Sequence, residues 1–251
     1  MSLENIKNYK DKGIYLIRNF YTQREIKSIK KNTIFIKNKK PKKKIGIMKY
    51  YENNIINKNK KILIRAEYFY NQNKILKKLI DSKKINKILE SLVGKKCVLF
   101  KEKINFKPPG CRQDKLHQDI QGDWEKYSKN FISALISIDK SNKKNGCLEF
   151  DISGHNHRKL KGKVFKTLKL SELKKPKFKK IELNVGDIVF FNGYIPHRSG
   201  KNVSKSNRSQ IYLTYNIKKD GNFRKAYFSE KRINFPPNNE RKEKKLYKYK
   251  I

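Results

Sequence analysis

The sequence predicts a mainly β protein, a sandwich or jelly roll that helices precede, which is an α+β class. Three observations indicate this class. From about residue 95 onward, short runs of residues alternate between apolar and polar, as in half-buried strands. Asn-Gly and Ser-Gly pairs, which favour tight turns, separate several of these runs. The 251 residues can bury a sizeable core, so we expect one domain over residues 1–251.

The chain begins with a short strand and a helix. Residues 14–17 are apolar and are expected to form the strand. Thr22 and Glu25 stand three residues apart, and at this spacing their side chains can satisfy two free amide donors at a helix start. We therefore predict a helix that begins at Thr22 and continues to about residue 32.

Two more helices are predicted before the first long strand. They are expected over residues 66–80 and 82–93, and Gly94 suits the left-handed residue that ends the second. Residues 36–62 are rich in Lys, Asn and Ile without a clear period, so we expect a loop or a weakly structured insertion there. Residues 1–94 are thus predicted to form a helical N-terminal part.

The jelly-roll core is predicted over residues 95–220. Its strands are expected at residues 100–107, 131–138, 147–150, 163–168, 179–183, 187–192 and 209–217. Many short strands with turns between them are typical of a jelly roll rather than of parallel units with crossover helices. Residues 221–251 are basic, contain Pro236 and Pro237, and are expected to run over the outside as a C-terminal extension.

The net charge of +42 has two explanations. A basic surface could bind nucleic acid, since lysines neutralise phosphates and release counter-ions. However, the basic residues lie along the whole chain beside abundant Ile and Asn, and only ten of the 64 are Arg. Because AT-rich codons encode Lys, Ile and Asn, genome composition accounts for much of the excess. A nucleic-acid partner is therefore not expected, although a field this positive should attract anionic substrates.

Cysteine usage and the start of the chain indicate a cytoplasmic protein. Cys97, Cys111 and Cys147 are odd in number and lack CxxC spacing, which argues against a disulfide framework or a cysteine-ligated metal. The first apolar run, residues 14–17, is far too short for a secretory signal or a membrane span. We expect no membrane association.

A His-x-Asp triplet, which contains His117 and Asp119, is the strongest chemical signal in the chain. Alternation along an extended segment puts these two side chains on one face, where both can reach the same ion. His197 follows 78 residues after Asp119, and a β scaffold could bring it to the same place. Two imidazoles and one carboxylate are the ligands of a facial iron(II) site with open coordination positions. The alternative is that both histidines are hydrogen-bonded loop residues.

The strand that follows His197 carries a candidate anion site. Arg208 lies eleven residues beyond His197, and its guanidinium suits a dicarboxylate through charge-assisted, bidentate hydrogen bonds. Ser199, on the same face as His197, could donate its hydroxyl to the same carboxylate. Alternate residues of the strand, Gln210 and Tyr212, are also polar. This face points either to solvent or into a polar barrel lumen.

These motifs resemble the phytanoyl-CoA dioxygenase family of iron(II)- and 2-oxoglutarate-dependent oxygenases over nearly the whole chain. The matching blocks begin at Gly13 (Gly-Ile-Tyr-Leu-Ile-Arg-Asn-Phe), His117 (His-Gln-Asp), Asn145 (Asn-Gly-Cys-Leu-Glu-Phe), Gly186 (Gly-Asp-Ile-Val-Phe-Phe), Pro196 (Pro-His-Arg-Ser-Gly-Lys-Asn) and Arg208. Within the family, the run Lys-Glu-Lys-Ile-Asn-Phe-Lys from Lys101 is similar to the branch that contains the 2-aminoethylphosphonate dioxygenases. Residues 108–116 depart from that branch in having less Gly, which leaves the substrate open.

The resemblance implies a double-stranded β-helix, the cupin-like barrel form of the jelly roll. It also implies that His117, Asp119 and His197 bind Fe(II), and that Arg208 and Ser199 hold the distal carboxylate of the cosubstrate 2-oxoglutarate. With O2, and with ascorbate as reductant in vitro, such an enzyme hydroxylates a C–H bond and releases succinate and CO2.

The resemblance further implies a small, anionic substrate such as an aminoalkylphosphonate. A phosphonate dianion needs cationic partners. Candidate substrate-binding residues lie in or beside the predicted site segments: Lys101, Lys103, Asn105, Arg112, Trp124 and Arg158. The strand lysines could equally face solvent, and Trp124 could simply pack in the core.

Two other functions remain open. A nucleic-acid-binding protein could keep the jelly-roll scaffold without chemistry. A metal-dependent isomerase or lyase of cupin type would have the same fold but would not require Arg208. The sequence names neither the substrate nor the oligomeric state.

Overall fold

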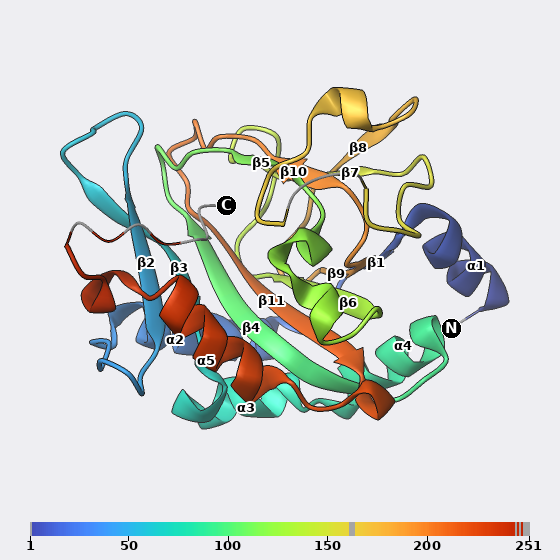
Figure 1. Cartoon of the computed structure of the whole chain (residues 1–251), viewed down its shortest axis with the longest axis horizontal. Helices are drawn as coiled ribbons and strands as arrows, with labels where there is room; N and C mark the ends of the chain where they lie inside the picture. The colour runs from blue at the N-terminus through green and yellow to red at the C-terminus, as the bar shows by residue number, and fades with distance from the viewer. Residues whose placement is uncertain (1, 161–163, 244, 246, 248–251) are drawn as a thin grey trace.

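Two antiparallel sheets face each other in the computed structural model, which describes residues 2–160, 164–243, 245 and 247 (Figure 1). The larger sheet has the order β1-β9-β6-β11-β4-β3-β2. Its strands are β1 (Ile14–Ile17), β2 (Met48–Asn53), β3 (Lys61–Glu67), β4 (Cys97–Lys107), β6 (Phe131–Ser137), β9 (Ile188–Asn192) and β11 (Arg208–Ile217). The smaller sheet, in the order β5-β10-β7-β8, consists of β5 (Asp114–His117), β7 (Leu148–Asp151), β8 (Phe178–Ile181) and β10 (His197–Ser199). This is the predicted jelly roll.

Five helices accompany the sheets in the described residues. They are α1 (Leu3–Lys12), α2 (Gln23–Asn38), α3 (Lys74–Ile80), α4 (Lys83–Val93) and α5 (Arg224–Asn234). Short 3-10 turns are η1 (Tyr70–Gln72), η2 (Asp119–Gly122), η3 (Trp124–Lys126), η4 (Leu170–Glu172), η5 (Lys218–Asp220) and η6 (Asn238–Glu240). Within the described ranges, none of the helices combines the length and apolar character needed to cross a membrane.

Strand alternation divides the core into two layers. On β6, Ala134 and Ile136 pack with helices α1 to α4, whereas Leu135 between them turns toward the smaller sheet. On β9, Phe190 faces the helices and Phe191 faces the smaller sheet. The large sheet is therefore buried on both faces, with helices on one side and the functional sheet on the other.

Local signals at helix ends are confirmed. Thr22 and Glu25 form the expected capping box, although the helix continues to Asn38. Ser82 caps α4, and Gly94 ends it with a left-handed φ of 72°. The strands predicted from residue 100 onward are also found, to within three residues, except the one at 163–168.

Two predictions for the first half of the chain are wrong. Residues 36–62 are not a loop, because they hold the end of α2 and all of β2, and the segment predicted as a helix over 66–80 is helical only from Lys74. β2 pairs with β3, and β3 pairs with β4. Their sequences lack an apolar–polar alternation, so the hydrogen bonds to the neighbouring strands stabilise them. The part called helical, residues 1–94, therefore also supplies β1, β2 and β3 to the large sheet.

The strand predicted over residues 163–168 is also wrong where the structure describes it. Lys163 lies outside the described residues, and residues 164–168 form turns and irregular structure. Phe165 has a φ of 64° and donates its amide to the Gln121 carbonyl, and Leu168 donates to the Leu116 carbonyl. These single hydrogen bonds hold the segment against the site without forming a ladder.

The C-terminal segment does not simply run over the outside, as its composition predicts. Helix α5 crosses β4 (Figure 1), and its side chains Tyr227 and Phe228 are buried. At the start of the helix, the Arg224 guanidinium donates two hydrogen bonds to the carboxylate of Glu102 on β4, which is fully buried. Ion pairs of this kind hold α5 against the open side of the jelly roll.

Two glycines offer a matched test of the packing around β7 and β10. Gly146 has a φ of 77°, and a Cβ there would lie 2.3 Å from the Gly200 carbonyl oxygen, whereas a Cβ at Gly94, with a φ of 72°, would meet nothing within 4 Å. We expect Gly94→Ala to cost about 1–2 kcal/mol of unfolding free energy through backbone strain. Gly146→Ala should cost about 1–3 kcal/mol more because of the clash. Urea unfolding of both variants measures the difference, and equal losses would contradict the close packing.

Candidate active site

Three predicted ligands converge at one end of the smaller sheet. His117 is the last residue of β5 and pairs directly with His197, the first residue of β10. Asp119, two residues after His117, begins η2. The two imidazole rings lie 4.3 Å apart between centroids, and His117 Nε2 lies 4.0 Å from Asp119 Oδ1. One ligand atom from each of the three residues lies within 4.8 Å of the others. The structure therefore brings the three side chains close enough to hold one metal ion.

Backbone carbonyls fix the orientation of both imidazoles. His117 Nδ1 lies 2.7 Å from the Lys115 carbonyl oxygen, and His197 Nδ1 lies 3.0 Å from that of Ile195. A carbonyl can only accept, so each Nδ1 carries the proton and each Nε2 keeps its lone pair for a ligand. Burial lowers the pKa of His117 to about 4 and also lowers the pKa of His197. Both rings are thus neutral at neutral pH, as metal binding requires.

Asp119 is ionised although it is buried. Burial by itself raises the pKa of this carboxyl group, but the positive charges of the neighbouring Lys103 and Lys101 outweigh that effect and lower the pKa. An ionised carboxylate beside two neutral imidazoles gives the donor set one negative charge. This set suits a divalent ion with positions left open for other ligands.

Gln118, the middle residue of the triplet, points away from the ligands and is buried. Its amide group donates to the carbonyls of Tyr194 and Arg158, and its amide oxygen accepts from Leu160 N at 2.9 Å. Gln118 therefore fastens two neighbouring loops to the segment that carries His117 and Asp119. Strand alternation could have identified this role, because it places the middle residue on the opposite face.

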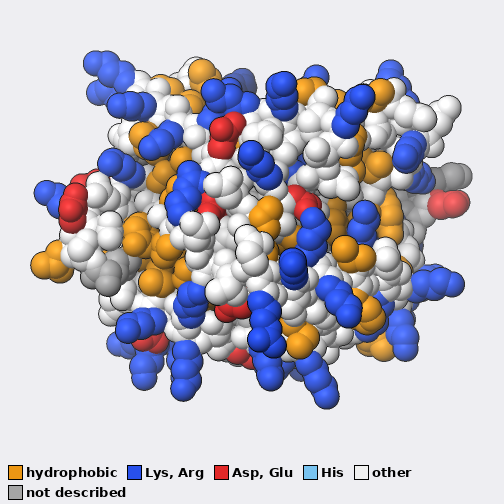
Figure 2. All heavy atoms as spheres, turned by 180° about the vertical axis from the view of Figure 1, so that it is seen from behind, with side chains coloured by type: hydrophobic (Ala, Val, Ile, Leu, Met, Phe, Trp, Pro, Cys, Tyr) orange, Lys and Arg blue, Asp and Glu red, His pale blue; other side chains and the backbone are white. Residues whose placement is uncertain are grey.

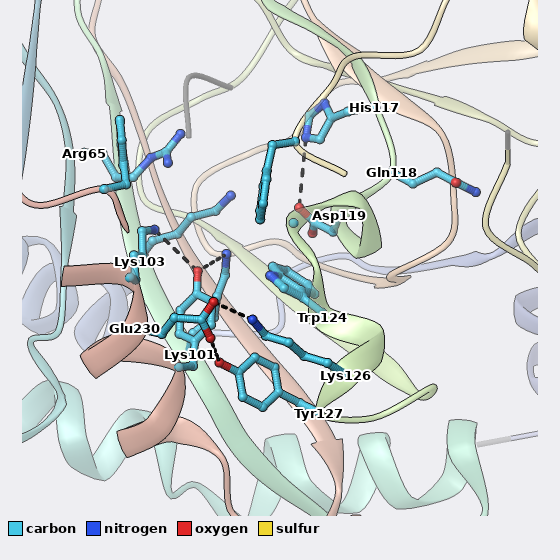
Figure 3. A pocket seen from close by; sticks show the side chains of 15 residues that line it. Arg65, Lys101, Lys103, His117, Gln118, Asp119, Trp124, Lys126, Tyr127 and Glu230 are labelled. Carbon is cyan, nitrogen blue, oxygen red and sulfur yellow. Dashed lines mark hydrogen bonds and ion pairs between the residues drawn. The ribbon is translucent and has the colours of Figure 1, made fainter. Parts of the chain in front are cut away.

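A pocket of about 110 Å³ opens beside the ligands (Figure 3). One wall of the pocket is formed by strands, with Arg65 on β3 and Lys101 and Lys103 on β4. Trp124 of η3 lines another wall. Tyr227 from α5 completes this part of the wall. Lys101, Lys103 and Trp124, which the sequence proposed for the substrate, thus border the same pocket as the metal ligands.

The two strand lysines face inward, so the solvent-facing alternative is excluded for them. A bulge in β4 leaves Phe100 without an opposite residue on β11, and Phe100 joins the aromatic cluster beneath the pocket. Lys101 is 7% exposed, and Lys103 is partly buried. Burial lowers the pKa of Lys103 and lowers that of Lys101 well below its usual value.

Asn105, Arg112 and Arg158 do not line this pocket. Asn105 and Arg112 border a smaller neighbouring cavity, where Arg112 forms a fork with Glu52. Arg158 is exposed and contributes only its carbonyl, which accepts from Gln118. The loop after β7 leaves the Arg158 side chain exposed, so neither cavity supports the predicted substrate contact.

Arg208 borders the smaller cavity and is 1% exposed. Its Nη1 donates to Gln210 Oε1 at 2.9 Å, while its Nε is buried and has no hydrogen-bond partner in the described part of the chain. Gln210 and Tyr212 on the same face are buried too. The polar face of β11 therefore points into the interior, and the solvent-facing alternative is excluded.

Ser199 lies among charged groups that the sequence did not connect with it. Its hydroxyl donates to Asp114 and accepts from Lys107 Nζ at 2.7 Å, and Lys107 pairs with Asp114 at 3.1 Å. Ser199 therefore contacts a partly buried ion pair beside Arg208. Arg65 was missed as a wall residue because no strand was predicted between the expected loop at 36–62 and the expected helix at 66–80. Tyr227 was missed because its segment was predicted as an outer extension.

Comparison with known proteins identifies the family of the chain. Residues 9–210 match the family model for phytanoyl-CoA dioxygenase (PhyH). The chain is 36% identical over 200 residues to a 2-aminoethylphosphonate dioxygenase from an uncultured bacterium. The aligned region covers 80% of this chain and 76% of the relative. It is 30% identical over 171 residues to a methylphosphonate hydroxylase from Gimesia maris, covering 68% and 65%.

A solved structure shows the same fold. EctD from S. alaskensis, determined with 2-oxoglutarate and 5-hydroxyectoine, superposes with a TM-score of 0.74 at 13% identity, covering 88% of this chain and 77% of that one. The fold, the convergent His-Asp-His cluster and the family match agree with one another. The chain therefore belongs to the phytanoyl-CoA dioxygenase family of Fe(II)- and 2-oxoglutarate-dependent dioxygenases.

Proposed function

We propose that this dioxygenase hydroxylates a C–H bond of a small anionic metabolite, such as an aminoalkylphosphonate, with release of succinate and CO2. The observation that carries the proposal is the cluster of His117, Asp119 and His197 beside a pocket with cationic walls. Two similar proteins, a 2-aminoethylphosphonate dioxygenase and a methylphosphonate hydroxylase, support a phosphonate substrate. The proposal includes a cytoplasmic location, which three free cysteines support.

The donor set fits Fe(II). Two neutral imidazoles and one carboxylate, all on one side, are the ligands that Fe(II) oxygenases use. Bound iron and 2-oxoglutarate would supply the oxidation, in which O2 gives one oxygen atom to succinate and one to the substrate. The carbonyls of Lys115 and Ile195 hold the imidazoles ready for the metal, so little reorganisation is needed on binding.

Arg208 is the proposed partner of the distal carboxylate of 2-oxoglutarate. Its buried Nε lacks a partner, and an unsatisfied buried guanidinium donor is costly unless a ligand accepts from it. Lys107 and Ser199 lie nearby and could share the same carboxylate. A cupin-type isomerase or lyase would not need this arginine, so its burial favours the oxygenase.

The nucleic-acid alternative has no specific observation in its favour. Figure 2 shows Lys and Arg side chains spread over the face that it presents, interspersed with other side chains and not gathered into one stripe. A nucleic-acid footprint is expected as a patch or stripe on one face. The cations that line the pocket point inward, toward the proposed metal ligands.

Turnover tests the proposed reaction directly. Purified protein with Fe(II), ascorbate, O2 and 2-oxoglutarate should release succinate faster when 2-aminoethylphosphonate or methylphosphonate is present. Chromatographic measurement of succinate checks this expectation. If folded, iron-loaded protein does not bind 2-oxoglutarate in calorimetry, the proposal is wrong.

Removing one metal ligand should abolish the activity without unfolding the protein. We expect His197→Ala to weaken Fe(II) binding at least about tenfold to a hundredfold, since changes to groups that merely orient ligands already cost that much. Metal titration of the apoprotein provides the measurement. His157→Ala is the matched control because His157 is exposed. Equal iron affinity in the two variants would remove His197 from the metal site.

Replacing Arg208 should affect the cosubstrate selectively. The loss of charged hydrogen bonds in Arg208→Met is expected to raise the KM for 2-oxoglutarate about tenfold to a hundredfold, with part of the rate restored by excess cosubstrate. Steady-state kinetics with varied 2-oxoglutarate measures this change. Arg158→Met removes an exposed guanidinium and should leave the same KM unchanged. A normal KM in Arg208→Met would exclude its proposed role.

A further inference from the structure

Two lysines in the pocket wall lack a carboxylate partner. Lys101 and Lys103 stand two residues apart on β4 and reach the same pocket. Lys101 Nζ lies 4.2 Å from the centre of the Trp124 ring and donates to the Tyr227 hydroxyl at 3.5 Å. Lys103 Nζ lies 4.6 Å from the centre of the Tyr212 ring. Among the described residues, neither ammonium group forms an ion pair within 4.0 Å.

The nearby acids are already engaged. Glu67 accepts from Lys231 on α5 and lies 3.6 Å from Arg65 Nη1. Glu230 pairs with Lys126 at the pocket wall. These pairings leave the two β4 lysines with aromatic and hydroxyl groups as their direct contacts, while the carboxylate of Asp119, which acts on both lysines from beyond ion-pair distance, is a proposed metal ligand.

Arg65 adds a third cation to the same wall. Its Nε is buried and has no hydrogen-bond partner in the described part of the chain. Figure 3 shows Arg65, Lys103 and Lys101 on the strand side of the pocket, with His117 and Asp119 on the other side. A ligand between the two walls would therefore meet the cations at one end and the proposed metal site at the other.

This arrangement favours a doubly charged ligand. Burying ammonium groups without counter-ions is costly, and a bound anion would offset that cost. Charge-assisted hydrogen bonds from lysine and arginine suit the oxygens of a tetrahedral oxyanion. One water needs about 10–15 Å³ of such space, so a pocket of about 110 Å³ has room for a molecule of several non-hydrogen atoms.

We propose that Arg65, Lys101 and Lys103 bind the head group of the substrate, a tetrahedral dianion of the kind that small phosphonates carry, and select it over carboxylates. The proposal deepens the proposed function and rests on it, since it takes this pocket as the substrate site. Hydroxyl and aromatic neighbours position the lysines, and the hydrogen-bearing carbon of the ligand would extend toward His117 and Asp119.

Binding to the wild-type protein is the first test. Protein loaded with Fe(II) and 2-oxoglutarate without O2 is titrated in a calorimeter with methylphosphonate, inorganic phosphate and acetate. We expect methylphosphonate and phosphate to bind at least about tenfold more tightly than acetate, because only they present a tetrahedral dianion. Equal binding of acetate and methylphosphonate would overturn the proposal, and so would the absence of binding by all three.

Charge-removing variants are the second test. Lys101→Met and Lys103→Met should weaken methylphosphonate binding about tenfold to a hundredfold, while Lys103→Arg should keep most of the affinity. Lys225→Met is the matched control: Lys225 is exposed on α5, and its loss changes the net charge equally. Affinities in the Met variants equal to that of Lys225→Met would overturn the proposal.

Two further measurements keep the outcomes distinct. Each variant is titrated with Fe(II) and 2-oxoglutarate, whose binding should not weaken; if the wild type itself binds neither, the proposed function fails rather than this inference. Thermal unfolding of ligand-free Lys101→Met should occur at the same or a higher temperature, because the variant removes a buried amino group whose charged form has no carboxylate within ion-pair distance. A large drop would indicate a structural role for Lys101, and the wild-type titration would then decide the ligand class.

Discussion

The pairing of β10 with β5 is the interaction on which the site depends. It sets His117 opposite His197, although these residues are far apart in the chain. β10 has only three residues, and β7 holds its other edge. Such a short strand has little stability of its own, so its position depends on both neighbours and on the close approach of Gly146 to Gly200. The positions of His117 and His197 therefore depend on the packing of this small sheet.

Electrostatics joins the two halves of the site. Lys103 lies in the pocket wall and also helps to lower the pKa of Asp119. The same positive charges that keep the carboxylate ionised would attract an anionic ligand. The net charge of +42 adds a long-range field of the same sign. The basic composition, which forms no single surface stripe, thus favours the approach of anions to the pocket.

Helix α5 closes the pocket from the end of the chain. Arg224 reaches Glu102 on β4, and Lys231 reaches Glu67 on β3. Buried ion pairs contribute little net stability, but removing one partner is strongly destabilising. These pairs therefore fix the register of α5 on the sheet, and with it the position of Tyr227 in the wall. The jelly roll supplies the scaffold, while added segments such as α5 shape the pocket wall.

The sequence by itself determined the features that short-range physics sets. The capping box at Thr22, the strand alternation after residue 95, the His-x-Asp triplet and the candidate Arg208 could all be read from neighbouring residues. Only the tertiary structure decided the β2–β3 hairpin, the course of α5, the outward turn of Arg158 and the inward direction of the β4 lysines. Alternation assigns residues to two faces but does not say which face is covered, because distant segments provide the cover. For that reason the cluster of His117, Asp119 and His197 was predictable, whereas most of the pocket wall was not.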